Sequence, residues 1–196
     1  FFSDTLLASI SYSRSEKMTS EKKVLIVIAP RNFRDEELTE PINYLMQSGI
    51  PYEVISTTRG LAVGMLGGTM MIERTISEVN KDEISGYAGI MIVGGGGAPE
   101  YLWNDQSLLE LVRKFDQQRS IVSAICLAPA ILGQAGVLKD KKATVWNDDQ
   151  AIEQIRKGGG IFTSSPVVVD GRIITANGPL AAAAFGEKVA KAVRDS

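Results

Sequence analysis

The chain has 196 residues, of which 44% are hydrophobic and 22% are charged, and its formal net charge is −2. This length suits one compact α/β domain with a large core, and the charge offers no basic surface for a nucleic-acid backbone. No apolar run reaches the ~18 residues of a membrane-spanning helix, and a single cysteine cannot form an internal disulfide. We therefore expect a cytoplasmic protein, in a reducing compartment, that binds neither nucleic acid nor a membrane.

The first residues read FFSDTLLASISYSRSEK and lack the basic start, continuous apolar centre and small-residue cleavage site of a secretory signal. Met18 then opens MTSEKKVLIVIAP, which is typical of a natural start. We expect residues 1–17 to be an N-terminal extension, non-native or disordered unless it docks, and residues 18–196 to form a single domain.

From Lys23 onward, short β-branched runs alternate with helical patterns. Buried strands are expected at residues 23–30, 51–57, 88–93 and 121–125. Helices are expected at residues 35–49, at 106–118, from Pro129 onward and at 180–195. The glycine-broken residues 61–76 predict a small β excursion, and residues 160–178 predict two strands about a turn at Asp170 and Gly171. This alternation is typical of a doubly wound, mostly parallel sheet with helices on both faces.

In such a sheet, ligands bind outside the carboxyl ends of the strands, so the loops there are the first places to search for chemistry. The first such loop, PRNFRDEEL, carries Asp35, Glu36 and Glu37. Three acids in that place are typical of the first turn of a helix, whose dipole they complement. Glu37 also lies on a side that can face the edge of the sheet. Both interpretations stay open on these residues alone.

The second loop is GGGGAPE, residues 94–100, directly after the strand AGIMIV. Glycines allow a tight turn and present bare N–H groups that stabilise an oxyanion or bind a phosphate, but four glycines are also an ordinary turn. A dinucleotide-binding fingerprint is disfavoured because the first strand-to-helix turn contains no glycine. The Lys-Ser/Thr ending of a P-loop is absent as well.

The third loop holds the only cysteine, Cys126, between a strand that ends at Ile125 and a helix that begins near Pro129. This arrangement resembles the nucleophile elbow of α/β hydrolases, and the start of a helix favours a thiolate. A lone cysteine is otherwise often a buried core residue. The position at the carboxyl end of a strand favours reactivity.

Four segments together carry a family resemblance: KKVLIVIAP…FRDEELTEP, IMIVGGGGAPEYL, SAICLAPAILGQAGVL and VVVDGRIITANGP. In this order, over about residues 22–194, the chain resembles the ThiJ/PfpI (DJ-one-like) superfamily. The resemblance implies a flavodoxin-like, three-layer sandwich and a homodimer or higher homo-oligomer.

The resemblance also implies roles for particular residues. Cys126 would be the nucleophile and Glu37 its hydrogen-bonding partner. The oxyanion would be stabilised by backbone N–H groups of the loop residues Gly95 and Gly96 and of the residue after the cysteine, Leu127. In the protease-named branch an acid of the glycine loop acts across a subunit interface, and Glu100 occupies that place here.

The chain departs from this family because it contains no histidine. The protease-named branch has histidine directly after the cysteine, where this chain has Leu127. Other branches take histidine from a later loop, and the corresponding region TVWNDDQ offers Trp146 and Asn147 as pocket-lining residues. A Cys–His dyad is impossible within this polypeptide, which argues against a PfpI-type peptidase.

Without imidazole, a glutamate that burial keeps neutral can donate a hydrogen bond to the sulfur and favour the thiolate. The leading hypothesis is glyoxalase- or deglycase-type chemistry on small reactive carbonyls by Cys126 and Glu37, with no cofactor. The alternatives are a redox-sensing or chaperone-like stress protein without turnover, and a pseudoenzyme that binds a small ligand under the glycine loop. A metal site ranks lower, because only oxygen ligands remain and the acids at 35–37 and 148–149 are expected to be solvated.

Overall fold

The computed structural model describes residues 22–196, so the extension expected at residues 1–17 lies outside the described residues. Its central sheet contains six strands: β1 (Lys23–Val27), β3 (Tyr52–Ile55), β6 (Tyr87–Ile92), β7 (Ile121–Ile125), β10 (Val167–Asp170) and β11 (Ile173–Ala176). Their order is β10-β11-β7-β6-β1-β3. All neighbours are parallel except β10 and β11, which form the hairpin predicted about Asp170 and Gly171.

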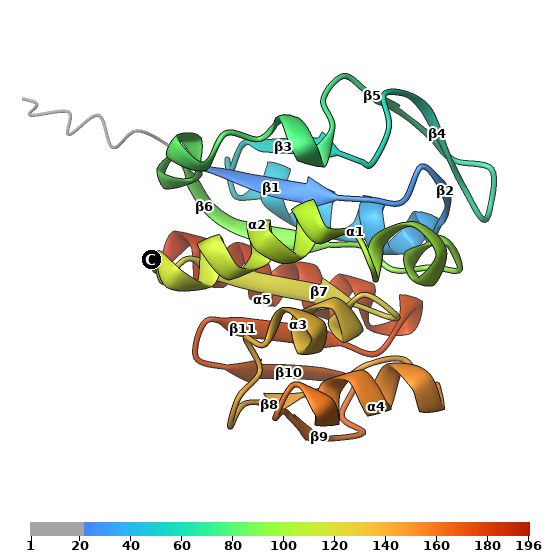
Figure 1. Ribbon diagram of the computed structural model, residues 1–196. Helices are drawn as coiled ribbons and strands as arrows, with labels where there is room; N and C mark the ends of the chain where they lie inside the picture. The colour runs from blue at the N-terminus through green and yellow to red at the C-terminus, as the bar shows by residue number, and fades with distance from the viewer. Residues whose placement is uncertain (1–21) are drawn as a thin grey trace, which may run out of the picture.

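Helices cover both faces of this sheet (Figure 1). On one face α1 (Asp35–Gln47) packs against α5 (Ala182–Arg194), and on the other lie α2 (Gln106–Gln117) and α3 (Pro129–Ala135), with α4 (Asp149–Lys157) packed on α3. None of the helices in residues 22–196 combines the length and the apolarity that crossing a bilayer requires. The doubly wound, three-layer α/β fold predicted from the sequence is confirmed.

The strand β1 shows why the layers form. Leu25 and Val27 belong to the core beneath α2 and α3, while Val24 and Ile26 belong to the core beneath α1 and α5. All four are at most 1% exposed. A continuous apolar run is therefore what this two-sided position requires.

Short elements complete the chain. The predicted β excursion forms a small sheet of β2 (Arg31–Phe33), β4 (Gly60–Gly64) and β5 (Thr69–Ile72). The others are β8 (Lys142–Ala143), β9 (Ile161–Phe162), η1 (Ile76–Glu78), η2 (Lys81–Gly86), the π-helix η3 (Ala98–Leu102) and η4 (Pro179–Ala181).

The helix α4 was not predicted. Asp148, expected to be a solvated acid, caps it instead, because its Oδ1 accepts the N–H of Ala151 at 2.9 Å.

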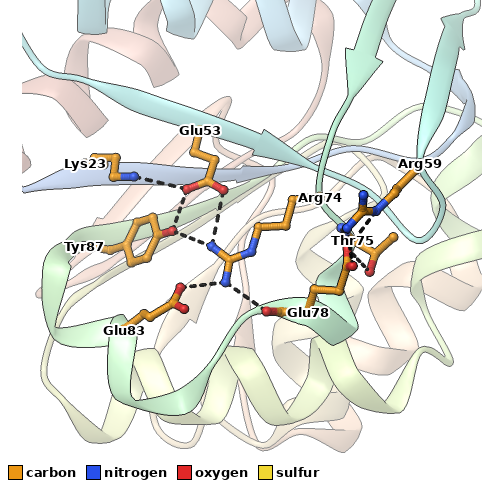
Figure 2. A network of polar contacts seen from close by, with 8 residues as sticks. All are labelled: Lys23, Glu53, Arg59, Arg74, Thr75, Glu78, Glu83 and Tyr87. Carbon is orange, nitrogen blue, oxygen red and sulfur yellow. Dashed lines mark hydrogen bonds and ion pairs between the residues drawn. The ribbon is translucent and has the colours of Figure 1, made fainter.

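A network of polar contacts, which we call the Arg74 network, fastens the edge strand β3 to its neighbours (Figure 2). Its members are Lys23, Glu53, Arg59, Arg74, Thr75, Glu78, Glu83 and Tyr87. Glu53 accepts hydrogen bonds from Tyr87 at 2.6 Å and from Lys23 at 3.3 Å, and Arg74 donates to Glu83 at 2.6 Å. Lys23 and Tyr87 begin β1 and β6, so these contacts lie at the amino ends of the parallel strands.

Candidate active site

Cys126 lies at a sharp bend between β7 and α3. Its φ is 64°, in the left-handed region that residues other than glycine rarely adopt. Its N–H donates to the carbonyl of Ala176 at 2.9 Å, and its own carbonyl accepts the N–H of Trp146 at 2.8 Å. These bonds hold a conformation that costs about 1–3 kcal/mol. The strand, bend and helix follow one another as the sequence predicts.

Glu37, the third residue of α1, is fully buried beside Cys126. Its Oε2 accepts the N–H of Gly94 at 3.1 Å, whereas its Oε1 has no hydrogen-bond partner within the described part of the chain. A Cβ at Gly94 would lie 2.5 Å from the Cβ of Cys126 and 2.9 Å from Oε2 of Glu37. The two side chains therefore meet at a place that only glycine leaves open, and we call them the Cys–Glu pair.

Burial dominates the electrostatics of the Cys–Glu pair. It raises the pKa of Glu37 from 4.5 to about 7, although hydrogen bonding with Cys126 and Gly94 and the charge of Arg34 act in the opposite direction. Burial also raises the pKa of the Cys126 thiol to about 12, and the charge of Glu37 adds to this rise. The expectation of a lowered thiol pKa is therefore wrong, because desolvation and like charge outweigh the start of α3. Near neutral pH the pair carries at most one negative charge.

The three successive acids of the first loop have three different surroundings. The carboxylate of Asp35 accepts two backbone N–H groups of the turn between β4 and β5, at 2.7 and 2.8 Å. Glu36 forms an ion pair with Arg34 at 2.8 Å, at the surface. Only Glu37 turns into the protein. Asp35 and Glu36 are therefore acids of a first helical turn, whereas Glu37 points into the protein, and its functional role stays a prediction.

The backbone donors predicted around the sulfur fall into two groups. The N–H groups of Gly95 and Leu127 act on the sulfur of Cys126 and oppose the rise in its pKa. The N–H of Gly96 instead donates to the Sδ of Met65 at 3.4 Å. Sequence reasoning missed Met65 because it lies in a turn about thirty residues from the glycine loop.

Trp103 was also missed in the sequence. Its indole N–H donates to the carbonyl of Leu127 at 2.9 Å and so fixes the peptide between Leu127 and Ala128, one residue beyond the cysteine. A tryptophan just beyond a predicted loop carries no sequence signal for this role.

The remaining predicted residues lie farther out. Trp146 is bound to the bend through its backbone, and the residue is 47% exposed. Asn147 and Glu100 are exposed, and within residues 22–196 neither has a backbone hydrogen bond to Glu37 or Cys126. Glu100 instead interacts with Tyr101 and raises the pKa of that hydroxyl.

The described residues contain no group of three or more His, Cys, Asp or Glu side chains placed to hold a metal ion. Each of the two acid clusters considered from the sequence contains one aspartate that accepts backbone hydrogen bonds. These are Asp35 in the first cluster and Asp148 in the second.

Comparisons with known proteins agree on one family. A sequence model of the DJ-1/PfpI family matches residues 22–192. A protein of Methanocaldococcus jannaschii described as uncharacterized is 49% identical over 191 residues, which cover 96% of this chain and 92% of that protein. Deglycase PfpI of Pyrococcus furiosus is 30% identical over 158 residues, 79% of this chain and 90% of that protein. The crystal structure of a ThiJ/PfpI domain protein from Brachyspira murdochii has a TM-score of 0.82 at 32% identity, covering 89% of this chain and 99% of that one.

Proposed function

Because this chain belongs to the DJ-1/PfpI family, we propose that it converts small reactive carbonyl compounds through the Cys–Glu pair, in glyoxalase- or deglycase-type chemistry. The observation that carries the proposal is that Glu37 is fully buried beside Cys126 while its Oε1 has no hydrogen-bond partner within the described residues. Relatives from Pyrococcus furiosus and Thermococcus kodakarensis, at about 30% identity, are named deglycases, which supports the substrate class.

The raised pKa of Glu37 suits it to proton transfer. A general acid or base works best when its pKa lies near the operating pH, and burial brings that of Glu37 to about 7. The thiol is protonated at rest, so its proton passes to the Glu37 carboxylate as the sulfur attacks. The pair then does the work that a Cys–His dyad does elsewhere.

The reaction balances without an outside oxidant. The sulfur of Cys126 forms a bond to the aldehyde carbon of a 2-oxoaldehyde, and the carbonyl oxygen becomes an oxyanion near the N–H groups of Gly95 and Leu127. Glu37 returns the thiol's proton to this oxyanion, which completes a hemithioacetal and leaves Glu37 ionised. Glu37 then moves a proton from that carbon to its neighbour, and the hydroxyl proton passes to the neighbour's oxygen. This isomerisation oxidises the first carbon to a thioester and reduces the second to an alcohol. Water hydrolyses the thioester to a 2-hydroxy acid and restores the thiol.

Two alternatives lack this support. The chain has no histidine, so a Cys–His peptidase mechanism is not open to it. A redox sensor reacts as a thiolate, and burial raises the pKa of the Cys126 thiol, which lowers the thiolate fraction available to an oxidant in the resting protein. Two further properties stay predictions: that the chain forms a homodimer, and that it lies in the cytoplasm. Light scattering of the purified chain tests the first of these.

The decisive assay follows methylglyoxal loss and lactate formation with wild type, Cys126→Ala and Glu37→Gln. We expect Cys126→Ala to fall to the uncatalysed rate and Glu37→Gln to lose about 100-fold or more. Glu36→Gln is the matched control, because it removes the neighbouring acid of the same helix turn and leaves the pair intact. Equal rates for wild type and Cys126→Ala would refute the proposal and favour a pseudoenzyme that only binds a ligand.

A further inference from the structure

The turn between β4 and β5 is fastened to the start of α1. Asp35 accepts the N–H of Leu66 through Oδ2 at 2.8 Å and the N–H of Gly68 through Oδ1 at 2.7 Å. The N–H of Met65 donates to the carbonyl of Phe33 at 2.9 Å. Three hydrogen bonds therefore fix this turn beside the residues that begin α1, two positions before the buried glutamate.

The fixed turn brings the side chain of Met65 to the glycine loop. Its Sδ accepts the N–H of Gly96 at 3.4 Å, and its Cε lies 3.9 Å from where a Cβ of Gly96 would be. Gly96 directly follows Gly95, whose N–H acts on the sulfur of Cys126. The methionine sulfur therefore accepts the backbone N–H that directly follows, along the chain, the N–H acting on the reactive sulfur.

A thioether is a weak hydrogen-bond acceptor, so a carbonyl or hydroxyl oxygen competes well for the same N–H. Met65 is 47% exposed, and its unbranched side chain has room to move outward. The N–H of Gly96 is thus held by a partner that a ligand oxygen can displace.

We infer that Met65 is the specificity-determining residue of this site and acts in two ways. Its sulfur is a displaceable acceptor, here called the cap, on the N–H of Gly96. The bulk of its side chain limits the size of the group beside the reacting carbon. The inference rests on the proposed function. A 2-oxoaldehyde carries a second oxygen on the carbon next to the one attacked. With the first oxygen at the N–H groups of Gly95 and Leu127, the second takes the N–H of Gly96 from Met65. A bulky substituent on that second carbon meets the methionine side chain.

Two substitutions separate the two roles of Met65. Met65→Leu removes the acceptor and keeps the bulk, whereas Met65→Ala removes both. We expect each to lower KM for methylglyoxal about fivefold, because the substrate no longer displaces the sulfur, and to leave kcat within about twofold. Only Met65→Ala is expected to improve phenylglyoxal relative to methylglyoxal, by about tenfold.

Met71→Leu is the matched control, since Met71 lies on β5 of the same hairpin, is 59% exposed and has no hydrogen bond to the glycine loop among residues 22–196. Thermal unfolding of every variant is measured first, and a purely structural role for Met65 would not change the ratio of the two substrates. A wild-type KM in both Met65 variants, or the same changes in Met71→Leu, would overturn the inference.

Alkylation of Cys126 by iodoacetamide distinguishes failure of the cap from failure of the proposed function. The reagent forms a C–S bond and releases iodide, and its amide oxygen is an acceptor for the freed N–H of Gly96. The chain has one cysteine, so mass spectrometry reports this site alone. We expect Met65→Ala to react about fivefold faster than wild type. Equal alkylation rates would overturn the cap even if wild type consumes methylglyoxal. Faster alkylation of Met65→Ala without any methylglyoxal turnover would support the cap and refute the proposed function.

Discussion

The Arg74 network holds the carboxylate of Glu53 at the amino ends of the parallel strands, and the Cys–Glu pair holds that of Glu37 at their carboxyl ends. In the network, burial alone would raise the pKa of Glu53, but hydrogen bonds from Tyr87 and Lys23 and the nearby positive charges outweigh it and hold that pKa below its usual value. In the pair, burial is not outweighed, and the pKa of Glu37 rises to about 7.

The difference lies in the number of partners. Glu53 accepts hydrogen bonds from three side chains, whereas Glu37 accepts one backbone N–H and leaves Oε1 without a hydrogen-bond partner among the described residues. A carboxylate with several hydrogen-bond donors around it stays ionised near neutral pH and stabilises the fold. A carboxylate left short of partners exchanges its proton near neutral pH, which is the property that chemistry uses.

The largest expected effect comes from removing the two carboxylates separately. Glu37→Gln lowers methylglyoxal turnover by about 100-fold or more, while Glu53→Gln leaves turnover unchanged and lowers the free energy of unfolding by about 1 kcal/mol. Steady-state kinetics and urea unfolding measure the two quantities. Similar loss of turnover in both variants would remove the distinction between site and scaffold.

The stability of the protein should depend on pH through Glu37. Its pKa is higher in the folded state than in the unfolded chain, so the folded state binds the proton more tightly. That contribution is fully present below about pH 4.5 and is lost as pH rises through about 7, and it amounts to about 3 kcal/mol. Urea unfolding between pH 5 and pH 8 measures it. In Glu37→Gln the free energy of unfolding should depend less on pH over this range. An unchanged pH dependence would contradict a carboxyl group that is buried and has one oxygen without a partner.

A methyl group at Gly94 should push apart the two members of the Cys–Glu pair. Its Cβ would lie 2.5 Å from both the Cβ of Cys126 and the carbonyl oxygen of Ile125, so we expect Gly94→Ala to cost about 1–3 kcal/mol and to abolish turnover. Gly86→Ala is the control, because open space surrounds a Cβ there. Chemical unfolding and turnover of both variants test this, and normal turnover by Gly94→Ala would show that the pair does not need its close contact.

The smallest effect is expected at Tyr87. Tyr87→Phe removes the 2.6 Å hydrogen bond to Glu53 while Lys23 and Arg74 remain, so the free energy of unfolding should fall by about 1 kcal/mol. Turnover should not change. A loss of turnover here would show that the two ends of the sheet are coupled.

Local patterns predicted most of the fold. The continuous apolar run of β1, the cysteine between β7 and Pro129, and the turn at Asp170 are all set by neighbouring residues. The helix α4 was missed because its cap, Asp148, was interpreted as part of a solvated acid cluster.

The site was only partly predictable. Sequence spacing does not tell which of three adjacent acids turns inward, and Glu37 was chosen through the family resemblance. The contact of Met65 with Gly96 depends on a turn that Asp35 fixes from about thirty residues away, and no local pattern encodes such a contact. The raised thiol pKa was missed for a related reason, since desolvation follows from packing that the sequence does not show.

The electrostatic coupling of Cys126 to Glu37 is the property on which the proposed chemistry depends most. Its most direct test is the pH dependence of Cys126 alkylation by iodoacetamide, in wild type and in Glu37→Gln. The wild-type rate should climb from about pH 7 to about pH 10 without a plateau, because the thiol pKa is raised to about 12. The Glu37→Gln profile should shift to lower pH by about one unit or more, because the like charge is gone. Superimposable profiles would show that the charge of Glu37 does not act on the Cys126 sulfur.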